Sequence, residues 1–234
     1  DGDWSSDVCS PDLNTTAVDT AAAVVDASGN WWGTTDEAAI AAGVTGPVDF
    51  TPYLESGDAD AVAPGFQGDF SSLTVTALGE QTGTTGRIQE AVDAADAAST
   101  VHVNAGTYLE NVVIDKALDV LGADPATTII DATGLTVAGT VRVLEPAGDV
   151  LFDGFTVQGG TNASGHHYQL IVTDTSAADT VTIRNNVFHG AGASRDFGVI
   201  AQNGQAAVEV VDNAFDNFYW HGVFFERWAG PTEV

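Results

Sequence analysis

Short apolar runs broken by glycine, asparagine and aspartate dominate the hydrophobic pattern of this chain. Runs such as STVHV, TVRVL, DVLFD and TVTIR alternate apolar and polar positions over about four to eight residues, which is typical of β-strands. One stretch, TTGRIQEAVDAADAAS, has helical spacing instead, and either Thr84 or Thr85 is placed to act as its N-cap. Its apolar face consists of Ile88, Ala91, Val92 and Ala95. The pattern therefore predicts many short strands and one amphipathic helix near 84–98.

Three of the runs resemble one another. FDGFTVQG, IRNNVFHG and VVDNAFDN align without gaps when Phe152 is placed over Ile183 and Val210. The same register aligns two further sets, Val157 with Phe188 and Phe215, and Phe155 with Asn186 and Asn213. A repeat of about this length with two or three strands favours one coil of a parallel β-solenoid, in which equivalent positions stack about 4.8 Å apart. The helix would then cap the first coil and cover its exposed edge.

The stacked asparagines have two interpretations. Asn186 and Asn213 fall at the same bend of successive coils, where side-chain amides can bond the next turn and tolerate left-handed geometry. We expect an asparagine ladder that stabilises the coils; the alternative is a pair of amides that contact a sugar. Val157, Phe188 and Phe215 are expected to form a stack inside the core.

The segment that begins with the predicted helix, at about residue 84, resembles the opening coils of right-handed parallel β-helix proteins of the pectin-lyase-like class. The pattern that carries the resemblance consists of Val101, Val103, Gly106, Thr107, Tyr108, Glu110, Asn111, Val113, Ile114, Lys116, Leu118, Leu121 and Gly122. The resemblance covers about 84–228 and implies an all-β fold, a right-handed parallel β-helix with a short N-terminal capping helix. This fold hosts lyases, hydrolases, adhesins and inert stalks, so the resemblance does not define an activity.

An upstream segment resembles the closing coil of the same kind of β-helix. Its pattern consists of Asn30, Trp31, Trp32, Gly33, Gly46, Pro47, Asp49, Phe50, Pro52, Tyr53 and Leu54. We therefore expect residues 14–57 to end one β-helix unit, 58–74 to be a linker rich in Gly, Ser, Asp and Pro, and 75–234 to begin the next unit. A closing coil before an opening coil predicts a fragment, truncated at both ends, of a tandem-repeat protein.

The first residues differ from the rest of the chain. DWSSDVCSPDL (3–13) matches one translated frame of a widely used sequencing adapter at all positions except Pro11. We interpret residues 1–13 as a non-native segment, with native sequence beginning near Asn14; the alternative is an ordinary N-terminus. Cys9, the only cysteine, then carries no biological meaning.

The charge balance is strongly acidic. The chain has 33 Asp and Glu residues against 6 Lys and Arg, a net charge of −27. Such a charge repels nucleic acids and anionic membrane surfaces. The acidic composition resembles that of proteins from salt-loving organisms, in which molar salt screens the repulsion between like charges. There is no apolar run of transmembrane length, so we expect no membrane insertion. Glycosylation sequons at Asn14 and Asn162 fit an extracellular or cell-surface location.

Candidate catalytic and metal-binding residues follow from the resemblance and the alignment. Polysaccharide lyases of this fold generally bind Ca²⁺ through converging carboxylates and use an Arg or Lys as base, and calcium needs six to eight oxygen ligands. The alignment places Asp153 over Arg184, with Asp212 and Asp216 one coil further on. Asp153, Arg184 and Asp212 are thus the catalytic candidates, and Asp212 and Asp216 the Ca²⁺ candidates. The alternative is a surface ion-pair ladder.

The run FDNFYWHGVFFERW contains the candidate carbohydrate-binding residues Tyr219, Trp220 and Trp228. Exposed rings beside charged residues suit stacking against sugars, whereas the alternative has them pack on a following coil. The sequence leads us to expect a non-catalytic β-helical module of a secreted or cell-surface repeat protein, structural or adhesive, which contacts polysaccharide and the adjacent units of its parent chain. The rival hypothesis is a fragment of a calcium-dependent polysaccharide lyase.

Overall fold

Three sheets of mainly parallel strands, wound by one chain, make up most of the structure, a computed structural model. It describes residues 18–19, 24–58, 65–176, 178–192 and 195–234, so the predicted non-native segment 1–13 lies outside the described residues. In the described part the chain forms a parallel β-solenoid of about seven turns, which confirms the predicted solenoid. The right-handed sense stays a prediction, in keeping with the general handedness of parallel crossovers.

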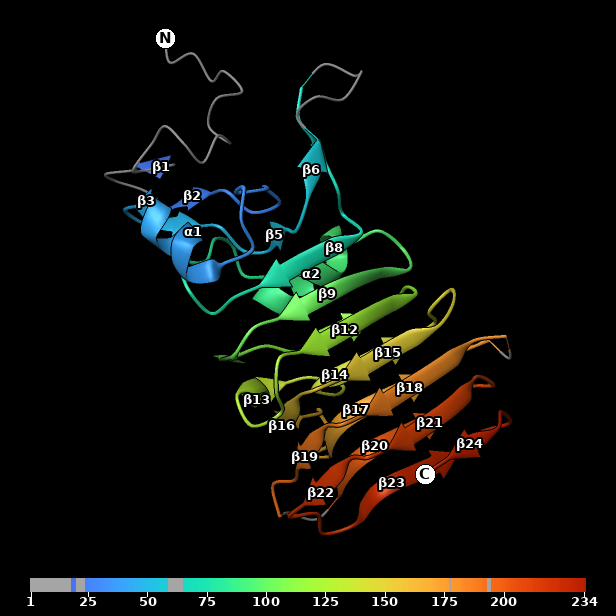
Figure 1. Cartoon of the computed structure of the whole chain (residues 1–234). Helices are drawn as coiled ribbons and strands as arrows, with labels where there is room; N and C mark the ends of the chain where they lie inside the picture. Colours follow the sequence, from blue (N-terminus) through green and yellow to red (C-terminus); the bar gives the residue numbers. More distant parts are fainter. Residues whose placement is uncertain (1–17, 20–23, 59–64, 177, 193–194) are drawn as a thin grey trace.

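Each complete coil, from β9 (Ser99–Val103) to β23 (His221–Glu226), places one strand in each sheet. Sheet I contains β5 (Tyr53–Leu54), β8 (Ser72–Val75), β9 (Ser99–Val103), β12 (Leu118–Gly122), β15 (Val150–Asp153), β18 (Thr180–Arg184), β21 (Ala207–Val211) and β24 (Thr232–Glu233). Sheet II contains β10 (Gly106–Tyr108), β13 (Thr128–Thr136), β16 (Thr156–Thr161), β19 (Val187–His189) and β22 (Ala214–Asp216). Sheet III contains β11 (Val112–Ile114), β14 (Val141–Leu144), β17 (His167–Thr173), β20 (Asp196–Gln202) and β23 (His221–Glu226). Figure 1 shows sheet I descending from β8 to β24.

The predicted stacking of equivalent positions is confirmed. Phe152 pairs with Ile183, which pairs with Val210, and all three side chains are buried. In sheet II, Val157, Phe188 and Phe215 form the second predicted stack, with the rings of Phe188 and Phe215 5.3 Å apart and nearly parallel. Alternate residues of each strand thus fill one continuous core inside the coils, and this burial of apolar surface stabilises the solenoid.

Helix α2 (Arg87–Ala94) covers the core at the first coil, and Ile88, Ala91 and Val92 are buried as predicted. The predicted N-cap, Thr84 or Thr85, was wrong, because the N-cap is Gly86, which has no side chain to accept a hydrogen bond. The carboxylate of Glu110 accepts from the backbone N–H groups of Ile88 (3.0 Å) and Gln89 (2.9 Å) instead. A residue brought in by the fold therefore caps the helix.

The N-terminal residues form a small second core against the solenoid. Helix α1 (Glu37–Gly43) is capped by Asp36, and short parallel pairs join β1 (Val18–Asp19) to β3 (Val44–Thr45) and β2 (Val25–Asp26) to β4 (Val48–Asp49). The apolar residues of this core are Ala27, Ile40, Val48, Phe50 and Tyr53. In the described residues, no helix is both long and apolar enough to cross a membrane.

Polar and backbone contacts join this N-terminal region to the first coil. The carboxylate of Glu37 accepts from the hydroxyl of Thr76 and from Asn104 Nδ2 (2.8 Å), and Asp49 accepts from the backbone N–H of Thr82 (2.6 Å). Strand β5 pairs with β8 in antiparallel fashion, and β6 (Gly57–Asp58) pairs with β7 (Gln67–Gly68). The predicted division at 57 and 74 thus falls among strands that pair with one another, and the division into units stays a prediction.

Candidate functional site

The turns between sheets I and II position the catalytic candidates. Gly154, Asn185 and Asp212 occupy equivalent places in three successive turns, with φ angles of 88°, 53° and 55°. Glycine, asparagine and aspartate are the residues that adopt this left-handed conformation most readily. Each turn has only two residues between its strands, so the side chains on either side are held at a fixed register.

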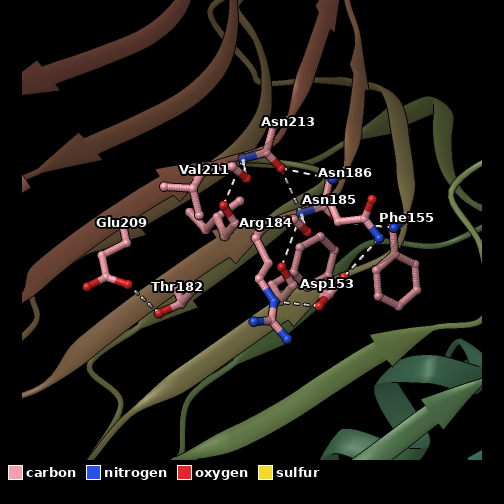
Figure 2. A network of polar contacts seen from close by, with 11 residues as sticks. Asp153, Phe155, Thr182, Arg184, Asn185, Asn186, Glu209, Val211 and Asn213 are labelled. Carbon is pink, nitrogen blue, oxygen red and sulfur yellow. Dashed lines mark hydrogen bonds and ion pairs between the residues drawn. The ribbon is translucent and has the colours of Figure 1, made fainter. Parts of the chain in front are cut away.

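Asn186 bonds to the coils above and below it (Figure 2). Its side chain is buried, and its Oδ1 accepts from the backbone N–H of Phe155 at 3.0 Å. Its Nδ2 donates to the carbonyls of Phe152 (3.1 Å) and Arg184 (2.7 Å) and to Asn213 Oδ1 (3.1 Å), which also accepts from the Asn186 backbone N–H at 2.9 Å. These bonds use the amide's donors and acceptor within the protein, so the structural interpretation of the asparagines is the one that the geometry supports.

Asp153 and Arg184 meet on the outer face of sheet I. Arg184 Nε donates to Asp153 Oδ2 at 2.6 Å, and Asn185 Nδ2 donates to Asp153 Oδ1 at 3.3 Å (Figure 2). The Arg184 side chain is 50% exposed and that of Asp153 19%. A half-exposed pair of this kind is typical of a surface ion pair.

Asp212 and Asp216 lie apart from this pair. Asp212 is an exposed turn residue beside Val211, the partner of Arg184 in sheet I. Asp216 Oδ2 lies 3.0 Å from His189 Nδ1 on the outer face of sheet II, one coil away. Among the described residues, no group of three or more His, Cys, Asp or Glu side chains is arranged to hold a metal ion. The calcium site therefore stays a prediction without support from geometry.

Trp228 faces the core instead of solvent. Sheet III strands end in left-handed residues, among them Asn203 and Arg227, so Gly204 and Trp228 occupy equivalent places one coil apart. A Cβ added to Gly204 would come within 2.4 Å of the Trp228 ring, and the half-buried ring packs on the main core. The indole Nε1 is buried and has no hydrogen-bond partner. This contact pattern fits the packing interpretation of Trp228.

The other two aromatic candidates are exposed beside sheet III. Tyr219 is 68% exposed and Trp220 48%, and both belong to the turn that leads into β23. The Trp220 ring stands edge-on to Phe197, with centroids 5.4 Å apart and an angle of 85°. The indole is thus fixed in orientation by packing while nearly half of its surface stays open to a ligand.

Phe197 lies at the centre of a group of rings, which we call the aromatic strip. The strip consists of Tyr168, Phe197, Trp220, His221 and Phe224. Tyr168, Phe197 and His221 are paired residues of β17, β20 and β23. The centroid of the Phe197 ring lies 5.2 Å from that of Tyr168 and 5.6 Å from that of His221. His221 stacks on Phe224 at 5.1 Å and 13°. The strip therefore crosses three coils along the solenoid axis.

Residues between the paired positions show why these rings point outward. Cβ atoms on Gly198 and Gly222 would meet the ring of the core residue Phe215, so both glycines face inward. The following residue of β20, Val199, also belongs to the main core, so two consecutive residues face inward and the alternation is interrupted. This irregularity leaves Phe197 outside the main core, although the pairing register of β20 with β17 and β23 is unbroken.

Tyr168 supplies a polar group at one end of the strip. Burial, together with the charge of Glu226, raises the pKa of the Tyr168 phenol, although Arg195 acts in the opposite direction. The phenol is therefore a neutral hydroxyl at physiological pH, able to donate and accept a hydrogen bond. The strip thus combines apolar ring surfaces with a hydroxyl and an imidazole, and it can hold a ligand that has both C–H and O–H groups.

Comparison of the chain with protein-family models, with curated proteins and with solved structures finds no match. The solenoid is therefore established by the register of its strands, and the pectin-lyase-like resemblance stays a prediction.

The sequence alignment did not reveal the strip. Tyr168, Phe197 and His221 are 29 and 24 residues apart, whereas the gap-free alignment has offsets of 31 and 27. Turns of unequal length between sheets II and III shift the spacing, so a fixed offset misses these pairs. The available signal in the sequence was an aromatic or histidine residue near the start of β17, β20 and β23.

Proposed function

We propose that this chain is a non-catalytic β-helical module of a secreted or cell-surface repeat protein and that it binds carbohydrate. The observation that supports the proposal is the aromatic strip, where Trp220 presents an open and orientationally fixed ring on the outer side of a rigid solenoid. Rigid aromatic side chains offer a large contact area at a small cost in conformational entropy. Rings of this kind suit the C–H faces of sugars.

The structural part of the proposal is supported by the coil interfaces. Parallel pairing continues through all three sheets, and the asparagine turn bonds successive coils to one another. Solenoids of this kind are extended scaffolds whose outer faces serve as binding surfaces. No specific observation favours the rival function, a calcium-dependent lyase, because Arg184, its candidate base, is engaged by Asp153.

Retention of the chain on immobilised glycans, in about 1 M KCl to screen its negative charge, tests the proposal. We expect retention on at least one glycan and no rise in ultraviolet absorbance when the chain is incubated with pectate or alginate and Ca²⁺. Failure to bind any glycan would overturn the carbohydrate part. Formation of unsaturated uronate products that Arg184→Ala abolishes would overturn the non-catalytic part.

A further inference from the structure

The electrostatic surroundings of the aromatic strip restrict its ligand. The chain carries 33 acidic and 6 basic residues, and its net charge of −27 produces a repulsive potential for polyanions at low ionic strength. At the strip, the charge of Glu226 raises the pKa of the Tyr168 phenol and the charge of Arg195 lowers it, so one acidic and one basic side chain act on this end of the strip. Arg195 Nη1 donates to the backbone carbonyl of Ser164 at 3.2 Å, which leaves it partly engaged. One partly engaged arginine, the basic residue shown to act on the strip among the described residues, is not the cluster of free cations that a uronate polymer requires.

Two histidines add polar groups to the aromatic strip. His221 belongs to the strip, and His166 lies 5.5 Å from Tyr168. Each imidazole offers two ring nitrogens for polar contacts with a ligand. A neutral ligand meets no electrostatic penalty, whereas an anionic one is repelled.

The exposed surface is too small for a protein partner of ordinary size. Among the described residues of the coils that carry the strip, from β15 to β23, Tyr219 and Trp220 are the exposed large apolar side chains, and Phe197 is only 5% exposed. A stable protein interface needs about 800 Å² on each partner, with an apolar centre. A narrow row of rings instead fits a narrow ligand. Three paired positions span two coil spacings, or about 10 Å along the solenoid axis.

We propose that the aromatic strip binds an uncharged polysaccharide that lies along the solenoid axis, with one sugar ring stacked on Trp220 and its hydroxyls in reach of Tyr168 and His221. This inference rests on the proposed carbohydrate function, and it specifies the charge class of the ligand and its position. A neutral glycan provides apolar C–H faces for the rings and hydroxyls for the polar groups. Such a ligand also meets no charge repulsion from so acidic a chain at low salt.

The test measures binding of the full chain to cellulose, xylan, mannan and chitin, and to polygalacturonate and alginate, at pH 8 and in 0.1 M and 1 M KCl. We expect binding to at least one neutral glycan at both salt concentrations and no binding to either uronate polymer at 0.1 M. Trp220→Ala should weaken the binding by about tenfold, or about 1.4 kcal/mol, because the stacked aromatic contact is lost. Phe66→Ala is the matched control and should leave binding unchanged, because Phe66 is a similarly exposed ring (40%) directly before β7. Strand β7 pairs with β6, which Figure 1 shows at the end of the molecule away from β23.

Each other result of this binding test would contradict one part of the proposal. Binding to polygalacturonate alone, at 0.1 M KCl and sensitive to Trp220→Ala, would overturn the uncharged class and leave the carbohydrate function standing. Binding to neutral glycans that Trp220→Ala and Tyr219→Ala leave unchanged would overturn the strip as the site. Binding to none of the six polymers would overturn the carbohydrate function itself. Circular dichroism spectra of the variants identify any loss of binding that comes from unfolding.

Discussion

Replacing Asn186 with alanine tests the idea that the amides join the coils. The change removes the acceptor of the buried Phe155 N–H and the donor to the carbonyls of Phe152 and Arg184. A buried N–H left without a partner costs about 1–3 kcal/mol, and each lost bond to a carbonyl about 0.5–1.5 kcal/mol. Some relaxation and water entry offset these costs, so we expect the free energy of unfolding to fall by about 3 kcal/mol. For a chain of this size that corresponds to a decrease in Tm of about 6–12 °C.

The neighbouring asparagine supplies a matched control. Asn185 is exposed, has a φ of 53° that glycine adopts freely, and makes one side-chain bond of 3.3 Å to Asp153. Asn185→Gly should therefore change the free energy of unfolding by about 0.5 kcal/mol or less. The second ladder member, Asn213, is half-buried, so Asn213→Ala should cost less than Asn186→Ala.

Chemical denaturation and hydrogen exchange together measure the effect. Because solenoids can unfold in parts, exchange of the Phe155 amide reports the local change directly. A double-mutant cycle of Asn186→Ala and Asn213→Ala should give a coupling of about 0.5–1.5 kcal/mol, since the two side chains are bonded at 3.1 Å. If Asn186→Ala matches Asn185→Gly in stability and leaves Phe155 protected, the ladder does not hold the coils together and the reasoning is wrong.

Three further predictions concern pH, the surface ion pair and salt. Burial and the carboxylate of Glu37 raise the pKa of Tyr53 to about 12, so the folded state retains the phenol proton more strongly than the unfolded chain. Stability should therefore fall as the pH rises above about 10, and Tyr53→Phe should reduce that fall in alkaline melting curves; an unchanged slope would contradict the assignment. Arg184→Ala should lower the free energy of unfolding by less than about 1 kcal/mol in urea titrations, because the ion pair is half-exposed, and a larger loss would show a deeper structural role. Raising KCl from about 0.05 M to 2 M should increase Tm by screening the net charge of −27, and a constant Tm would remove the argument for adaptation to salt.

Sequence reasoning predicted the parts of the fold that depend on regular spacing. The stack of Phe152, Ile183 and Val210 and the helix face at 87–94 follow from periodicity, and the structure confirms both. The helix start was wrong because its cap is Glu110, which is distant in sequence from the helix and reaches it only through the coil. No local pattern contains that information.

The candidate site also depends on contacts that no local sequence pattern contains. Tyr219 and Trp220 were identified from composition, and the structure places them at the surface beside sheet III. Phe197, which orients Trp220, was missed because the irregularity at Gly198 reverses the side that an alternating pattern would assign to it. Trp228 could not be distinguished from Trp220 by sequence, since the difference depends on packing over Gly204.

The turns between sheets I and II keep two residues in three successive coils, whereas the turns that enter sheet III differ in length, as 162–166 and 217–220 show. The solenoid thus separates a corner that sets coil register from a corner that accepts insertions. The variable corner adjoins the aromatic strip, because Trp220 belongs to it. Residues can therefore be added or exchanged next to the strip without disturbing the asparagine turn. Loop libraries for altered glycan selectivity belong at this corner, and homologous coils should diverge there first.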